Sequence, residues 1–143
     1  MSEEQPPMPN FEIDGSPHVI SFVETMEVTQ GVECDVYRFE GDNTRDLGIV
    51  RIQPGHKTHL QRVMGGERTI EGYVSGKGRF VVIRPDLTTQ VYLFDGSIEG
   101  LQVELAVGEI VQYFADEDSN LVASEICYPP YEDGRFENIE EES

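Results

Sequence analysis

The sequence predicts an all-β fold, arranged as one small antiparallel barrel or sandwich. Two observations carry this prediction. Short segments that alternate apolar and polar residues follow one another beyond Gly31, and turn-forming groups such as the Gly-Lys-Gly at 76–78 separate them. The turns recur at a spacing of roughly 8–12 residues, which is typical of sandwiches and barrels and not of proteins that alternate strands with helices.

The first element along the chain allows two interpretations. Ser16 and Pro17 suit the cap and the first turn of a short helix. The apolar residues between Val19 and Met26 also have helical spacing, but the β-branched ones among them suit a strand equally well. Both a helix and a strand therefore remain open here.

Every later element is expected to be a strand. The alternation is clearest where Val32, Cys34 and Val36 are separated by more polar residues. The predicted strands cover residues 32–39, 47–53, 69–75, 79–84, 90–94, 101–107, 110–114 and 121–127. Paired prolines at 129 and 130 are expected to end the sheet, because proline cannot donate a hydrogen bond to a neighbouring strand.

A chain of 143 residues fits one domain. We expect residues 16–131 to form the barrel. Residues 1–15 combine prolines with acids and are expected to form a loose N-terminal arm, and residues 132–143 a solvated acidic C-terminal tail. The prediction is thus one β-domain with flexible acidic termini.

The charge of the chain excludes two classes of partner. Its formal net charge is −18 at pH 7. Phosphate backbones and anionic membrane surfaces attract basic proteins and repel acidic ones, so we expect binding to neither nucleic acid nor membranes.

Other features favour a cytoplasmic protein. The N-terminal residues MSEEQPPMPN have acids and prolines where a secretory signal has a basic region and an apolar core. No apolar run approaches the roughly 20 residues that span a bilayer. Cys34 and Cys127 lie far apart and form no CxxC pair, so we interpret them as buried free thiols.

Four blocks of the sequence carry a resemblance to a known family. They read IVRIQPG at 49–55, EGYVSGKGRFVV at 71–82, VGEIVQYF at 107–114 and ICYPP at 126–130. In this order they resemble the cupin superfamily of small jelly-roll barrels, over residues 47 to 127 approximately. The resemblance implies a cupin-like jelly-roll barrel with a pocket between its sheets.

The metal-binding residues of that family are missing from their expected positions. A typical cupin has two histidines one residue apart, then a glutamate, then a further histidine. The corresponding positions here hold Gln61 and Val63 (or Arg62 and Met64), then Thr69, then Ser119 or Asn120. We therefore expect no metal cofactor of the usual kind.

A different metal site remains an alternative. His56 and His59 are three residues apart, which on an extended strand sends their side chains to opposite faces. A turn after Pro54-Gly55 could still bring them together. A divalent metal would then have His56, His59 and Glu71 as ligands.

Glu71 is the strongest candidate for a functional carboxylate. The resemblance implies that Thr69 faces the barrel interior, and strand alternation then points Glu71 and Tyr73 inward as well. A buried carboxylate needs a partner, and Arg51 on the preceding predicted strand could supply it. A structural Glu71–Arg51 pair and a ligand-binding role for Glu71 both stay open.

These residues lead to two candidate functions. The first is a cupin-like protein that binds a small polar metabolite; the candidate ligand-binding residues are His59, Gln61, Thr69, Glu71, Tyr73 and Tyr113. The alternative is an enzyme, an isomerase or lyase acting on a sugar-like or carboxylated metabolite. In that case Glu71 is the general base and His59 a second proton carrier. A third hypothesis is an interaction module whose exposed apolar strand face forms a homodimer, and the cupin resemblance implies pairing through a sheet edge or face.

Overall fold

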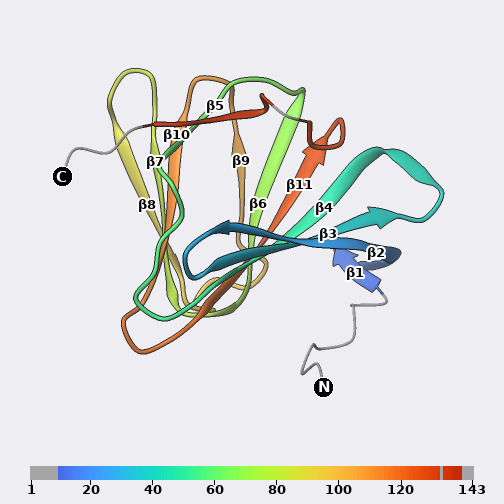
Figure 1. The fold of residues 1–143 in the computed structure, drawn as a ribbon, viewed down its shortest axis with the longest axis horizontal. Coiled ribbons are helices and arrows are strands. Elements are labelled where there is room, and N and C mark those ends of the chain that lie inside the picture. The colour runs from blue at the N-terminus through green and yellow to red at the C-terminus, as the bar shows by residue number, and fades with distance from the viewer. Residues whose placement is uncertain (1–9, 133, 140–143) are drawn as a thin grey trace.

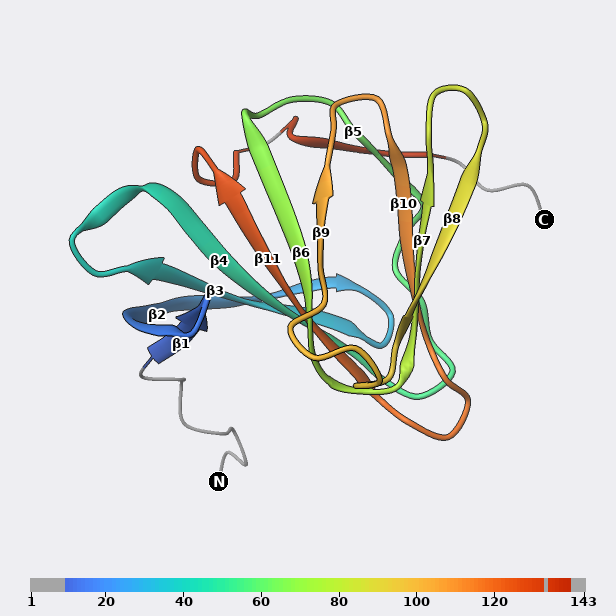
Figure 2. The same ribbon diagram turned by 180° about the vertical axis from the view of Figure 1, so that it is seen from behind.

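Two curled antiparallel sheets make up the described part of the protein (Figures 1 and 2). The computed structural model describes residues 10–132 and 134–139. The larger sheet has the strand order β1-β2-β3-β4-β11-β6-β9, and the smaller one has the order β12-β5-β10-β7-β8. The strands are β1 (Asn10–Ile13), β2 (Ser16–Thr29), β3 (Val32–Phe39), β4 (Asp42–Ile52), β5 (Gln61–Val63), β6 (Arg68–Gly76), β7 (Gly78–Ile83), β8 (Thr89–Phe94), β9 (Gln102–Leu105), β10 (Ile110–Ala115), β11 (Leu121–Tyr128) and β12 (Phe136–Asn138).

The all-β prediction is confirmed. Each of the eight predicted strands from residue 32 onward overlaps an observed strand. The ambiguous first element is the strand β2, which pairs with β1 at its start and with β3 along the rest of its length. Across the described ranges, no helix is long and apolar enough to cross a membrane.

Both ends of the chain contain strands where we expected loose segments. Residues 10–13 of the expected arm pair with residues 16–19 in a hairpin whose turn places Asp14 and Gly15 at positive φ. Residues 136–138 of the expected tail pair with β5. Arg135, just before β12, is buried and donates hydrogen bonds to the backbone oxygens of Arg68, Tyr128 and Pro129. Residues 1–9 and 140–143 lie outside the described residues.

The main core fills the space between the two sheets. Its centre is aromatic: the Tyr113 ring stacks on Phe80 with ring centroids 4.2 Å apart and meets Phe94 edge-on at 5.5 Å. Apolar side chains from both sheets surround these rings, among them Val32, Ile52, Val82, Leu105 and Leu121.

A second apolar cluster lies on the opposite face of the larger sheet. Tyr37, Leu47 and Ile126 face one another across β3, β4 and β11 because they occupy one row of the strand register. The next row, Val36, Gly48 and Glu125, faces the space between the sheets, since side chains alternate along a strand. The register therefore decides which polar residues reach the interior.

Candidate functional site

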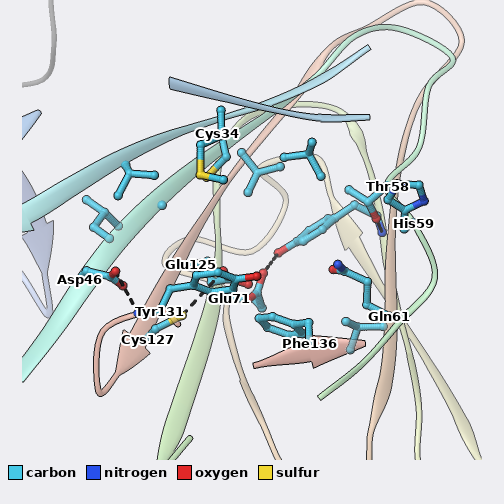
Figure 3. Close-up of a pocket in the computed structure, with 18 of the residues that line it drawn as sticks. Cys34, Asp46, Thr58, His59, Gln61, Glu71, Glu125, Cys127, Tyr131 and Phe136 are labelled. Atoms are coloured by element: carbon cyan, nitrogen blue, oxygen red, sulfur yellow. Dashed lines mark hydrogen bonds between the residues drawn. The ribbon is translucent and has the colours of Figure 1, made fainter. Parts of the chain in front are cut away.

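A cavity of about 500 Å³ opens between the two sheets, beside the aromatic core. Strands β2, β3, β4, β6 and β11 form one wall, and β5, β10 and β12 with the adjoining loops form the other. Its lining includes apolar side chains such as Met26, Val36, Val50, Val111 and Phe136, and polar ones such as Thr58, His59, Gln61, Glu71, Gln112 and Glu125. Figure 3 shows Glu71 and Glu125 near the middle of the cavity, with Asp46 and His59 towards opposite ends.

The strand register brings two carboxyl side chains together at this point. Glu71 on β6 is the direct partner of Glu125 on β11. Gly48 on β4 is the next residue in the same row, and a Cβ at this position would lie 3.0 Å from the Cys34 sulfur. Because Gly48 carries no side chain, the cavity keeps its volume beside the carboxyl pair.

Tyr113 fixes the orientation of Glu71. Its hydroxyl donates a 2.8 Å hydrogen bond to Oε1 of Glu71. The ring itself is held by its aromatic neighbours, and its backbone N–H donates to Thr58 at 2.9 Å. The Glu71 carboxyl is thus positioned by a rigid donor in the barrel core.

The other oxygen of Glu71 has no hydrogen-bond partner among the described residues. The side chain is 2% exposed, and its Oε2 atom is fully buried. Buried polar atoms in folded proteins are almost always paired, so an unpaired carboxyl oxygen needs an explanation. Across the row, Glu125 accepts a weak 3.7 Å contact from the Cys127 thiol.

The environment of Glu71 and Tyr113 favours their neutral forms. Burial raises the pKa of Glu71 well above its usual value; the charge of Glu125 and a hydrogen bond between the two carboxyls when they share a proton raise it further, and the Tyr113 hydroxyl opposes them. Burial and the neighbouring Glu71 raise the pKa of Tyr113 in the same way. Asp46 lies at the far end of the cavity, and burial raises its pKa as well. The backbone N–H of Tyr131 donates a 3.0 Å hydrogen bond to Asp46 and partly offsets this effect.

The two cysteines line the cavity as free thiols. Burial, and then the charge of Glu125, raise the pKa of Cys34 to about 12 and shift that of Cys127 in the same direction. The thiolate is the nucleophilic form of cysteine, so neither residue is suited to act as a nucleophile at neutral pH.

The structure brings four of the six predicted ligand-binding residues to the cavity: His59, Gln61, Glu71 and Tyr113. Thr69 and Tyr73 share the inward face of β6 but do not line the cavity. The hydroxyl of Thr69 is buried and accepts a 3.0 Å hydrogen bond from Arg135. Tyr73 packs edge-on against Phe94, and its hydroxyl donates to the backbone of Gly76.

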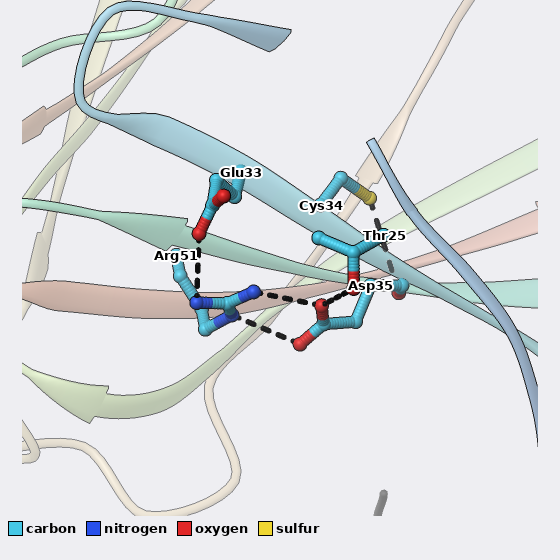
Figure 4. A network of polar contacts seen from close by, with 5 residues as sticks. All are labelled: Thr25, Glu33, Cys34, Asp35 and Arg51. Carbon is cyan, nitrogen blue, oxygen red and sulfur yellow. Dashed lines mark hydrogen bonds and ion pairs between the residues drawn. The ribbon is translucent and has the colours of Figure 1, made fainter. Parts of the chain in front are cut away.

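The expected pairing of Arg51 with Glu71 is wrong. Strand β11 lies between β4 and β6, and the register places Arg51 opposite Glu33, on the face away from the barrel interior. There its guanidinium donates to Asp35 at 2.9 and 2.8 Å and to Glu33 at 3.1 Å (Figure 4). Glu71 is therefore buried without a cationic partner among the described residues.

The alternative metal trio is not assembled. His59 and Glu71 line the cavity, but His56 does not; its ring lies against Gly31, where a Cβ would come within 2.4 Å of it. Within residues 10–132 and 134–139, no three His, Cys, Asp or Glu side chains are placed to hold a metal ion. The donor set therefore does not fit the metal that the fold family implies.

Sequence reasoning missed several cavity residues. Glu125 was the most informative omission, together with Asp46 and Gly48. Alternation alone pointed to two possible faces for each strand, and only the pairing of β4, β11 and β6 shows that these residues share the inward face with Glu71. The signal available in the sequence was the acid at position 125, the one charged residue of the predicted strand 121–127.

The carboxyl pair of Glu71 and Glu125 can bind a polar ligand and can exchange protons with it. A protonated carboxyl beside an ionised one is both a donor and an acceptor, and a ligand could use either. The apolar wall beside the pair can accommodate a carbon skeleton.

Comparisons with known proteins bear on the fold. No model of a known protein family matches the sequence, and no curated protein matches it. Among solved structures, the capsular polysaccharide assembling protein CapF from Staphylococcus aureus matches with a TM-score of 0.65 at 14% identity, over 89% of this chain and 36% of that one.

Two further structures give the same result. Oxalate decarboxylase from Bacillus subtilis matches with a TM-score of 0.66 at 19% identity, over 82% of this chain and 30% of its own. The 7S globulin of Momordica charantia matches with a TM-score of 0.62 at 14% identity, over 82% and 34%. The chain thus spans about a third of the length of these proteins. CapF and oxalate decarboxylase are both cupin-fold proteins, and the chain accordingly has the cupin fold that its four sequence blocks predicted.

Proposed function

We propose that this cupin-fold protein binds a small polar molecule in the cavity between its sheets. The observation that carries the proposal is the unpaired oxygen of Glu71, which is buried at the cavity with no hydrogen-bond partner among the described residues. Leaving such an oxygen without a donor is costly, and a ligand that donates a hydrogen bond would complete it in place of a proton shared with Glu125.

The size and lining of the cavity support the proposal. Its volume of about 500 Å³ falls within the range of roughly 300–1,000 Å³ that small-molecule sites occupy. Apolar side chains such as Val36 and Phe136 make up much of the wall, and a few polar groups converge at Glu71 and Gln61. Sites of this kind take their orientation and selectivity from the few polar groups.

A cavity-filling variant tests the proposal. Gly48→Val places two methyl groups beside the carboxyl pair. Gly48 has no positive φ, and the Cys34 sulfur, 3.0 Å from a Cβ there, has to shift by a few tenths of an ångström. Gly65→Val is the matched control, because a Cβ there meets nothing within 4 Å. A set of small polar metabolites is screened for stabilisation in thermal melts.

The expected result is that at least one compound raises the melting temperature of the unmodified protein and of Gly65→Val, but not of Gly48→Val. Equal stabilisation of both variants by every active compound would place binding outside the cavity and contradict the proposal.

We also propose that binding needs no resident metal, on the basis of the donor set. Thr69, and either Gln61 and Val63 or Arg62 and Met64, stand at positions where the cupin resemblance implies metal ligands, and His56 lies against Gly31 and does not line the cavity. Elemental analysis of the purified protein is the test. We expect no transition metal near one equivalent, and stoichiometric iron, manganese, nickel or zinc would overturn this part of the proposal.

A second candidate function is acid–base catalysis, as an isomerase or lyase acting on a sugar-like substrate. The observation that favours it is the pairing of Glu71 with Glu125, because two carboxyls in unequal environments can take opposite roles as acid and base. Glu71 would be the base in its ionised form, and His59 a second proton carrier within the same cavity.

Proton exchange distinguishes catalysis from binding alone. Compounds that bind are incubated with the protein in deuterated water and analysed by mass spectrometry. An enzyme incorporates deuterium at carbon, and Glu71→Gln abolishes that incorporation. If compounds bind but none incorporates deuterium, the binding function stands and acid–base catalysis is excluded.

A further inference from the structure

The charges around the cavity are of one sign. Glu24, Glu27, Asp46, Glu71 and Glu125 all line it. Among the described residues that do so, none is Lys or Arg, and His59 is the sole basic side chain. A concave site with one sign of charge and low-dielectric walls concentrates ligands of the opposite sign.

The acids are distributed from the rim to the base. Glu24 and Glu27 are exposed on β2, at the rim, whereas Asp46 and Glu125 are half-buried and Glu71 is fully buried. A cation that enters the cavity would therefore meet carboxylates along its whole path.

The guanidinium groups nearby do not line the cavity. Arg135 acts on Asp46 and Cys127 through its charge, but it is bound to backbone carbonyls and does not line the cavity. Arg38 is exposed and lines an adjoining groove that shares Asp46 with the cavity.

A second observation points to a ligand independently of the charge. The Oε2 atom of Glu71 lacks a hydrogen-bond partner among the described residues, and its side chain is 98% buried, as its 2% exposure implies. Its position next to Glu125 leaves two carboxyl groups facing one space with too few donors. The group missing from this site is a hydrogen-bond donor, and a positively charged donor makes the strongest bond to a carboxylate.

We propose that the molecule bound in the cavity is a small organic cation, an amine or ammonium compound whose charged nitrogen sits against Glu71 and Glu125 and whose carbon skeleton packs on Val36, Val50 and Phe136. This inference rests on the proposed function and specifies its ligand class. It argues against a carboxylated metabolite, which the ionised acids of the cavity would repel.

The shape of the site favours an organic cation over a bare metal ion. A cavity of about 500 Å³ is far larger than one ion needs, and no three potential metal ligands among the described residues converge in it. An ammonium group donates three hydrogen bonds, enough to reach Glu71, Glu125 and a third acceptor such as the Gln61 side chain.

Binding of a cation is coupled to the proton of the carboxyl pair. The groups facing Glu71 are Tyr113 from β10, Glu125 and Cys127 from β11, Cys34 from β3 and Asp46 from β4. None of them is cationic, so these surroundings favour a protonated Glu71. A bound ammonium favours the ionised form instead, and binding therefore releases a proton and strengthens as the pH rises.

Three probe compounds of one shape test the proposal. Benzylammonium, benzyl alcohol and benzoate share a ring and differ in charge. Isothermal titration calorimetry is run with each, in two buffers of different ionisation enthalpy, at several pH values. We expect benzylammonium to bind at least about tenfold more tightly than the other two. We also expect its binding to release a proton and to tighten with pH.

Variants locate the binding. Glu71→Gln and Glu125→Gln each remove one charge with little change in size, and we expect each to weaken benzylammonium binding at least about tenfold. Both variants are measured because a single substitution could weaken binding by perturbing the fold. Glu99→Gln, on an exposed loop, and Arg38→Gln, in the adjoining groove, are the controls and should leave the affinity within about twofold.

The outcomes separate this inference from the proposed function. If benzyl alcohol or benzoate binds as tightly as benzylammonium and Gly48→Val abolishes that binding, the cavity is a ligand site but not a cation site. Failure of all three probes to bind also overturns the cation inference. The proposed function fails only if, in addition, no compound in the metabolite screen depends on Gly48.

Discussion

Glu71 and Glu125 lie directly opposite each other on the neighbouring strands β6 and β11, with both side chains facing the space between the sheets. Like charges in this arrangement destabilise a sheet, and two adjacent carboxyls in a buried site cannot both ionise easily. The pair is therefore tolerable when it holds a proton or a cation. The proposed function depends on this relationship.

The stability of the protein should depend on pH through Glu71. The pKa of Glu71 is raised well above its ordinary value of 4.5 by burial and by Glu125. The folded protein then keeps a proton that the unfolded chain loses, so the free energy of unfolding falls as the pH rises from about 4.5 through the folded-state pKa, with a slope of up to about 1.4 kcal/mol per unit. Above that pKa, the whole contribution of the Glu71 proton to the free energy of unfolding is lost.

Glu71→Gln checks this prediction. The amide stays neutral, so chemical denaturation of the variant between about pH 5 and about pH 9 should show a flatter dependence, and the variant should be as stable as the unmodified protein or more so at the upper end. Glu99→Gln, an exposed control, should keep the original slope. Parallel curves for Glu71→Gln and the unmodified protein would contradict a protonated Glu71.

Tyr113→Phe should destabilise the protein through Glu71. The variant keeps the ring in its stack on Phe80 but removes the donor to Oε1, leaving a buried carboxyl with both oxygens unpaired. We expect a loss of about 1–3 kcal/mol. Since the hydroxyl lowers the pKa of Glu71, its removal should raise that pKa further.

Tyr92→Phe is the matched control for this change. Tyr92 also packs against Phe80, but it is only partly buried and lies outside the cavity. We expect a change within about 0.5 kcal/mol. Urea denaturation measures both variants, and equal effects would show that the hydroxyl of Tyr113 has no special role.

Arg51→Met should lower the stability of the protein slightly and leave ligand binding unchanged, because Arg51 lies on the face of the larger sheet that points away from the cavity. Arg51 is 42% exposed, so removing its ion pairs with Asp35 and Glu33 should cost less than about 1 kcal/mol, and less still at high salt. Burial tends to raise the pKa of Asp35, but hydrogen bonds from Arg51 and Thr25 outweigh it and hold that pKa below its usual value. Thermal melts at low and high salt measure the effect. Loss of ligand binding in this variant would contradict the register that separates Arg51 from the cavity.

The sequence predicted the strands from their alternation, but it could not predict their partners. The short strands β1 and β12 are four and three residues long, too short for a periodic pattern, and they are held by pairing with β2 and β5. The pairing also decides which side chains meet. Arg51 precedes Glu71 by one predicted strand, yet β11, from the other end of the chain, lies between their strands.

The candidate site could be predicted in part for the same reason. The cupin resemblance implies that Thr69 faces the interior, and the alternation of β6 then turns Glu71 inward as well. Whether an inward residue reaches a cavity depends on what fills the space around it. Arg135 occupies the space at Thr69, and Phe94 occupies that at Tyr73. Glu125 comes into the site through a long-range pairing that no local pattern records.

A homodimer remains a prediction, and the structure suggests where to test it. Strand β2 pairs with β1 only over residues 16–19, so among the described residues its edge beyond Val19 faces no neighbouring strand. Phe22 and Val23 are exposed there. Unpaired apolar edges are common sites of strand addition. We expect size-exclusion chromatography with light scattering to show a dimer that Val23→Lys dissociates and Val107→Lys, on an exposed loop, does not. A monomer at high concentration would contradict it.

The central claim is that a ligand completes the carboxyl pair of Glu71 and Glu125 inside the barrel. A crystal structure of the protein soaked with benzylammonium tests it most directly. The account predicts density for the compound between the sheets, with its nitrogen within hydrogen-bond distance of Glu71 Oε2 and its ring against Val36 and Phe136. A crystal structure in which side chains fill that space, or in which the Glu71 carboxyl points into bulk solvent, would contradict it.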